Sequence, residues 1–182
     1  HGVELEVKGL DYGQVIKNKD QIVQGLVKGL EFLLDKRRIR VLAGQARFLP
    51  SGEVQVGEDV FQADHVLVAT GTEPLELPGL EADGQVVVNS DQLLDRPALP
   101  ESLVIVGGGV IGCEFATVFA SYGVEVTVVE LQDRILPMED VEISRALTRE
   151  FKKRRIKVLT EAKVLGVERG QGAQVTIEQK GR

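Results

Sequence analysis

The chain has 182 residues, 43% of them hydrophobic, which is enough for one sizeable domain or two small ones. A net charge of −6 and the lack of tryptophan argue against a nucleic-acid partner, whose binding surface needs a basic excess and aromatic stacking. No apolar run of the sequence is long enough to cross a membrane. The single cysteine excludes an internal disulfide and fits a reducing compartment.

The first predicted element is an amphipathic helix over residues 18–38. Apolar residues recur there at helical spacing, in a stripe that includes Ile22, Leu26, Leu30 and Leu33. Short runs of β-type residues follow, with turn residues between them, and predict strands at 39–42, 46–49, 54–56 and 65–69.

Residues 72–100 have the composition of a connector, with four prolines, two glycines and several acidic residues. A second unit begins after it. Its pattern predicts helices from the end of the first strand to about Tyr122 and over 141–155, and strands at 103–106, 124–129, 156–160 and 175–177. This alternation indicates an α/β fold with a parallel sheet.

The turn between the first strand and helix of this unit reads Gly107-x-Gly109-x-x-Gly112. Gly107 permits a tight turn, Gly109 leaves room for a pyrophosphate, and Gly112 lets the helix pack closely on the strand. A glycine-rich turn without a ligand is the plain alternative. The strand–helix–strand context favours a dinucleotide site whose peptide N–H groups bind phosphate.

Glu130 ends the second strand of this pattern, 18 residues after Gly112. A carboxylate at this place can accept hydrogen bonds from both ribose hydroxyls of NAD and would repel the 2′-phosphate of NADP. No arginine follows directly, and Arg134 comes too late to compensate that repulsion. The sequence therefore predicts NAD rather than NADP; a solvated glutamate at a strand end is the alternative.

Glu114 and Cys113 lie in the first turn of the predicted helix. The helix dipole would stabilise the charge of Glu114, and the same position is where a nicotinamide would approach, so a structural and a functional role both stay open. Cys113 has no evident partner in the sequence, and we expect a small buried packing residue. No metal site is predicted.

One short sequence occurs twice: KRRIRVL at 36–42 returns as KRRIKVL at 153–159, 117 residues later, and a predicted amphipathic helix precedes each copy. Chance similarity is one explanation, because basic helix ends before apolar strands are common. The matching context favours two copies of one nucleotide-binding architecture. The first copy would then need a glycine turn before residue 1, and the second a strand after residue 182, so we expect a piece of a longer protein.

Five segments resemble the pyridine-nucleotide disulfide oxidoreductase family, in the order in which its members carry them. They are VLVATGTEP (66–74), LPGLE (77–81), VIVGGGVIGCEFA (104–116), GVEVTVVE (123–130) and DRILPMEDVEISRAL (133–147). The closest likeness is to the members that oxidise dihydrolipoamide, although mercuric reductases and related flavoenzymes share several of these motifs.

This resemblance implies two Rossmann-like FAD- and NAD-binding units, each incomplete, with a three-layer parallel sheet plus a β-meander. Residues 1–71 would be the C-terminal part of the FAD-binding domain, 72–100 a connector, and 101–182 an NAD-binding domain that lacks its last strand.

The resemblance also assigns cofactor-binding residues. For FAD they are Gly44, Thr70, Gly71 and Thr72. Glu114 would face the flavin and act electrostatically, beside a lysine near the redox-active cysteines of the family; no other residue matches a catalytic position. For NAD they are Gly107, Gly108, Gly109, Val110, Ile111, Gly112, Glu114, Glu130 and Val164.

The implied activity passes electrons from dihydrolipoyl thiols through a disulfide and the flavin to NAD. The resemblance further implies a cytoplasmic homodimer (in the mitochondrial matrix of a eukaryote) that acts on the dihydrolipoyl groups of a 2-oxoacid dehydrogenase complex. The sequence holds neither the redox-active cysteine pair nor the C-terminal dimer domain, so we expect the segment alone to be inactive. Two alternatives stay open: another NAD-dependent flavin disulfide reductase, such as a mercuric reductase, and a non-catalytic NAD-binding module.

Overall fold

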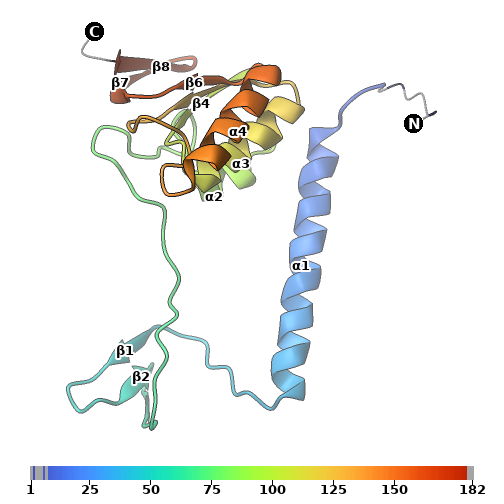
Figure 1. Cartoon of the computed structure of the whole chain (residues 1–182). Coiled ribbons are helices and arrows are strands. Elements are labelled where there is room, and N and C mark those ends of the chain that lie inside the picture. Colours follow the sequence, from blue (N-terminus) through green and yellow to red (C-terminus); the bar gives the residue numbers. More distant parts are fainter. Residues whose placement is uncertain (1, 3–5, 7, 180–182) are drawn as a thin grey trace. The chain divides into compact units, whose positions relative to one another are not determined.

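The computed structural model describes residues 2, 6 and 8–179, which form two compact units (Figure 1). One unit comprises residues 15–73, and the other comprises residues 74–182 together with the N-terminal 14 residues. None of the helices in the described part of the chain combines the length and the apolar content that a membrane crossing requires.

The helix predicted over 18–38 is present as α1 (Tyr12–Lys36), which lies almost wholly in the unit of residues 15–73. It begins earlier than predicted because the side chain of Asp11 accepts a hydrogen bond from the N–H of Gln14 and so caps the helix start. None of its residues is buried. The apolar stripe is exposed, with Leu26 at 70% and Ile22 at 65%.

A three-stranded antiparallel meander comes next along the chain, as the resemblance implied. It consists of β1 (Ala46–Phe48), β2 (Val54–Val56) and β3 (Asp59–Phe61). Phe48 is paired with Val54, and Val56 with Asp59. The turns between these strands contain Gly52 and Gly57, both with positive φ, which glycine adopts without steric cost.

The strands predicted at 39–42 and 65–69 are wrong. Neither segment forms a strand, and no strand in the described residues pairs with either. Their apolar side chains are exposed, Leu67 by 91% and Val41 by 67%. A strand outside a sheet leaves its backbone groups unpaired, so a β-type sequence alone does not stabilise one.

The unit of residues 74–182 is built on the predicted parallel sheet, with the strand order β4-β5-β6. β4 (Ser102–Val106) and β5 (Glu125–Val129) are joined by α3 (Val110–Ser121). α4 (Val141–Lys153) connects β5 to β6 (Lys157–Leu159). These elements confirm the α/β fold and fall within a few residues of their predicted bounds.

The core of this unit lies between the sheet and its helices. Phe119 of α3 and Phe151 of α4 are at most 2% exposed and pack with Val126 and Val128 of β5. Four such side chains bury enough apolar surface to stabilise the unit by several kcal/mol, at about 1.5–3 kcal/mol each. The ends of β4 and β5 lie next to each other because the two strands are paired, with Val106 opposite Val129.

An antiparallel hairpin completes the unit, formed by β7 (Ala162–Arg169) and β8 (Ala173–Gln179). The strand predicted at 175–177 lies within β8, whereas β7 was not predicted. A register irregularity between Val164 and Gly166 interrupts the alternation of more and less exposed residues along β7. The sequence of this strand therefore lacks a regular alternating pattern.

The later part of the predicted connector is packed against this unit. It contains a short helix, α2 (Ser90–Leu94), whose start is closed by reciprocal hydrogen bonds between Asn89 and Gln92. Leu93 is 6% exposed and belongs to the core, and Leu99 packs against that core. The contact pattern divides the chain after residue 73, near the predicted start of the connector.

Candidate nucleotide-binding site

The glycine turn joins the end of β4 to the start of α3. Gly107 has a φ of +106°, which favours glycine, and its N–H donates to the carbonyl of Val129 at the end of β5 (2.9 Å). Gly109 is the N-cap of α3, and no side chain caps it. The first N–H groups of a helix have no partner within the helix, so they form a natural site for an anion.

The three motif glycines have different surroundings. A Cβ at Gly112 would overlap the carbonyl oxygen of Gly107, so close packing within the turn requires glycine there. A Cβ at Gly109 would meet nothing within 4 Å, and its φ of −71° is open to any residue. No protein atom or backbone strain therefore accounts for glycine at 109, and the open space in front of it matches the room predicted for a pyrophosphate.

Glu130 lies beside this turn, as the motif predicted. The residue is buried, at 7% exposure. The N–H of Gly108 donates to its Oε2 at 2.6 Å, and the N–H of Gln132 donates to its Oε1 at 2.7 Å. Each carboxylate oxygen can accept a further hydrogen bond, so the group is fixed in place and still able to bind a hydroxyl.

The peptide group of Gly108 is also held from its other side. Its carbonyl oxygen accepts hydrogen bonds from the N–H of Leu136 (2.7 Å) and the thiol of Cys113 (3.3 Å). A Cβ at Gly108 would come within 2.8 Å of a methyl group of Ile135, which is fully buried. Contacts within the protein therefore hold the peptide group of Gly108 on both sides, which lowers the entropy cost of binding a ligand at this turn.

Cys113 is buried, as predicted, at 4% exposure. Burial, together with the nearby charge of Glu130, raises the pKa of its thiol to about 11. The thiol therefore keeps its proton near neutral pH and can donate it to the Gly108 carbonyl. No partner for this residue is evident in the sequence because the partner is a backbone oxygen.

The remaining NAD-assigned residues lie on two elements. Val110 and Ile111 are more than half exposed in the first turn of α3. Glu114, which was expected in that first turn, lies one turn later because α3 begins at Val110, and it is also exposed. Val164 lies in β7, paired with Ile177. The start of β7 is joined to the site because the N–H of Ala162 donates to the carbonyl of Glu130 at 3.0 Å.

The FAD-assigned residues lie in the other unit, in two separate exposed segments. Gly44 has a φ of +151°, and a Cβ there would come within 2.9 Å of a methyl group of Val56 in β2. Thr70, Gly71 and Thr72 come after β3 in an irregular segment. Both segments are exposed, whereas Glu130 beside the turn of Gly107–Gly112 is buried.

Comparison with known proteins gives consistent relationships. Residues 4–182 match the family described as pyridine nucleotide-disulphide oxidoreductase. The chain is 43% identical over 177 residues to a dihydrolipoyl dehydrogenase of Bacillus subtilis, covering 90% of the chain and 37% of that protein. The chain thus spans less than two fifths of this relative's length.

The solved structures that are similar to it include proteins of two different bacteria. LpdA from Mycobacterium tuberculosis has a TM-score of 0.80 at 29% identity, over 93% of this chain and 39% of that one. The HOCl-induced flavoprotein disulfide reductase RclA from Escherichia coli has a TM-score of 0.76 at 27% identity, over 95% and 40%. With the fold and the glycine turn, these matches establish that the chain belongs to the pyridine nucleotide-disulphide oxidoreductase family.

Proposed function

We propose that the turn of Gly107–Gly112 and the carboxylate of Glu130 bind NAD. The first peptide N–H groups of α3 would hold the pyrophosphate, and Glu130 would accept hydrogen bonds from the adenosine ribose. The observation that carries this proposal is the 2.6 Å hydrogen bond between Glu130 and the N–H of Gly108, which fixes the ribose acid next to the phosphate turn.

Glu130 also favours NAD over NADP. A 2′-phosphate would bring negative charge against the carboxylate of a residue that is only 7% exposed, at a cost of roughly 1–4 kcal/mol at contact. Val110, Ile111 and Val164 would provide apolar contacts to the dinucleotide.

We further propose that the chain is part of an FAD-dependent dihydrolipoyl dehydrogenase. Family members with that name use FAD and NAD, and relatives with that name are 36–43% identical to this chain. Gly44, Thr70, Gly71 and Thr72 would contribute to the FAD site, and Glu114 would face the flavin. When bound, FAD supplies the two-electron chemistry between a dithiol and NAD.

The substrate and partners of the whole protein belong to the same proposal. They would be the dihydrolipoyl groups of a 2-oxoacid dehydrogenase complex and a second copy of the same chain. The described residues contain one cysteine, which is buried, so the segment alone would bind nucleotide without turning over a dithiol.

A second candidate is another NAD-dependent flavin disulfide reductase, since the fold also matches the flavoprotein disulfide reductase RclA. Assaying a longer form of the protein with NAD and dihydrolipoamide separates this candidate from the first. If NAD binds but no flavin or dithiol chemistry occurs in any longer form, a non-catalytic NAD-binding module is the better description.

NADH fluorescence tests the site itself. We expect saturable binding to the 182-residue chain, binding of NADPH at least about tenfold weaker, and a loss of affinity of roughly tenfold in Gly109→Ala, whose Cβ would occupy the ligand's space. Gly170→Ala is the matched control, because a Cβ there also meets nothing within 4 Å but lies in the hairpin turn. Equal NADH affinity in both variants would contradict the proposal.

A further inference from the structure

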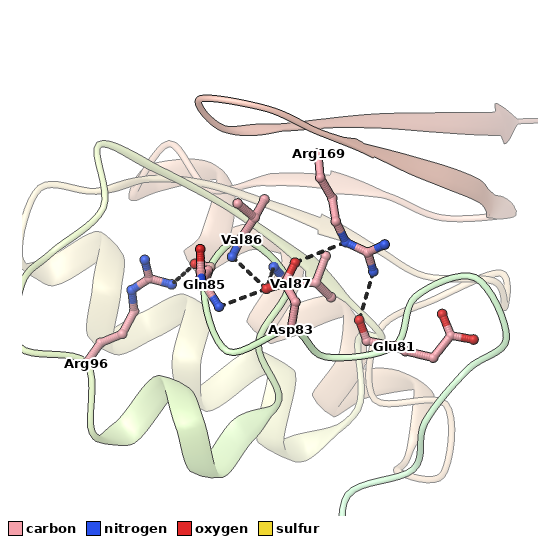
Figure 2. Close-up of polar contacts among 7 residues, drawn as sticks. All are labelled: Glu81, Asp83, Gln85, Val86, Val87, Arg96 and Arg169. Carbon is pink, nitrogen blue, oxygen red and sulfur yellow. Dashed lines mark hydrogen bonds and ion pairs between the residues drawn. The ribbon is translucent and has the colours of Figure 1, made fainter.

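A polar network outside the nucleotide site organises the loop that precedes α2 (Figure 2). The Oδ1 atom of Asp83 accepts hydrogen bonds from the backbone N–H groups of Gln85, Val86 and Val87, at 2.8, 2.8 and 3.0 Å. The N–H of Asp83 in turn donates to the carbonyl of Val87 at 2.9 Å. These bonds close residues 83–87 into one compact loop.

Arg169, at the end of β7, reaches this loop from a distant part of the sequence. Its Nε lies 3.0 Å from Oδ2 of Asp83, and its Nη2 donates to the carbonyl of Glu81 at 2.8 Å. The guanidinium therefore binds a side chain and the main chain on the two sides of Ala82. Such a paired contact is geometrically more specific than a single surface ion pair.

The loop is also held on its other side. Arg96 donates from Nη1 to the carbonyl of Gln85 at 2.7 Å, and Leu93 in the intervening α2 is buried in the core. The segment of residues 81–96 is thus tied to the nucleotide-binding unit at both ends. Before it, Leu75 is 85% exposed, and residues 71–78 form no helix or strand.

We propose that residues 71–78 are a flexible hinge in the chain, and that Arg169 sets where this hinge ends by holding residues 81–87 on β7. The hinge contains the point after residue 73 at which the chain divides. Gly71 is its first residue and Gly79 follows its last one, and both have positive φ, +73° and +82°. Without Arg169 the hinge extends to about residue 84, because Arg96 still binds the carbonyl of Gln85, and the hydrogen bonds from Gln85–Val87 to Asp83 open more often.

Hydrogen exchange on the full 182-residue chain tests this inference. In the wild type, amides of residues 71–78 exchange much faster than those of Gln85–Val87. Arg169→Met speeds exchange at Gln85–Val87 by about three- to tenfold, because the loop loses two contacts of partly exposed groups. Exchange in β4, β5 and β6 stays unchanged, and NADH affinity changes by less than about twofold, because Arg169 is not part of the nucleotide site.

Three variants sharpen the result. Arg169→Lys, which keeps the charge, restores part of the protection. Asp83→Asn keeps an oxygen for the three N–H groups but loses the charge that binds Arg169, and gives intermediate exchange. Arg145→Met, the same change at an exposed position of α4, leaves exchange at Gln85–Val87 as in the wild type.

Unchanged exchange at Gln85–Val87 in Arg169→Met, or equally slow exchange at residues 71–78 in the wild type, would overturn the inference. So would a rise in exchange throughout the sheet, since Arg169 would then support the unit as a whole. A wild-type chain that does not bind NADH would count against the nucleotide site alone, because the exchange pattern is measured without nucleotide.

Discussion

The two copies of the repeated sequence, KRRIRVL and KRRIKVL, have the same local structure and different surroundings. In both, the second arginine has positive φ, +55° at Arg38 and +60° at Arg155. In both, the N–H of the next residue, an isoleucine, donates to the carbonyl five residues back, at 2.9 Å. The helix end is therefore encoded locally, in the same way twice.

The residues after the turn differ in structure between the two copies. Ile156 is 4% exposed and leads into β6, which pairs with β5. Ile39 is 54% exposed, and the residues after it form no strand. Of two nearly identical sequences, only the one that can pair with a neighbouring strand and pack against an apolar layer forms a strand.

The largest expected difference between the copies comes from truncating the two isoleucines. Ile156→Ala should lower the free energy of unfolding of its unit by about 2–4 kcal/mol, because it opens a cavity in the core. Ile39→Ala should change stability by less than about 0.5 kcal/mol, since its side chain is already exposed. Urea denaturation monitored by circular dichroism measures both. Equal losses would mean that the first copy is packed after all.

Two glycine substitutions extend the contrast to helices. Gly112→Ala should lower stability by about 1–3 kcal/mol, because its Cβ would overlap the carbonyl of Gly107 and push α3 from the sheet. Gly25→Ala in α1 meets nothing within 4 Å and should raise helix stability by about 0.5–1 kcal/mol. Thermal unfolding of the two variants should therefore shift in opposite directions, and a neutral Gly112→Ala would contradict the close packing of the turn.

Glu130 and Glu114, the two acidic residues of the proposed site, also differ in how far the surrounding protein holds them. Both oxygens of Glu130 accept backbone N–H groups, so the single carbonyl of Glu130→Gln satisfies only one of them, at a cost of about 1–2 kcal/mol. Glu114 is exposed, and Glu114→Gln should leave stability unchanged within about 0.5 kcal/mol. Chemical denaturation of this pair distinguishes a carboxylate that also supports the turn from one that the fold does not need. Equal effects would remove the distinction.

The smallest expected effect tests what the copies share. Arg38→Gly and Arg155→Gly should each stabilise by up to about 1 kcal/mol, because glycine accepts positive φ without strain. The two gains should agree within error, since the turn is local. A gain at Arg155 alone would show that the surrounding packing, and not the sequence, imposes this conformation.

Sequence patterns predicted the packed unit better than the exposed one. The glycine turn and Glu130 could be placed side by side from the sequence because their spacing in a strand–helix–strand unit fixes where they meet. The strands at 39–42 and 65–69 failed because pairing partners cannot be read from local composition. The hydrogen bonds from Cys113 and Leu136 to Gly108, and from Arg169 to Glu81, could not be predicted. Their acceptors are backbone oxygens, which every residue type carries.

Amide resonances of the glycine turn test the central claim most directly. In a ¹H–¹⁵N spectrum of the 182-residue chain, added NADH should shift the signals of Gly108–Gly112 and Gln132 in a saturable way, while those of the meander at residues 46–61 stay in place. Saturable shifts elsewhere with none at Gly108–Gly112 would contradict the assignment of the pyrophosphate to the start of α3.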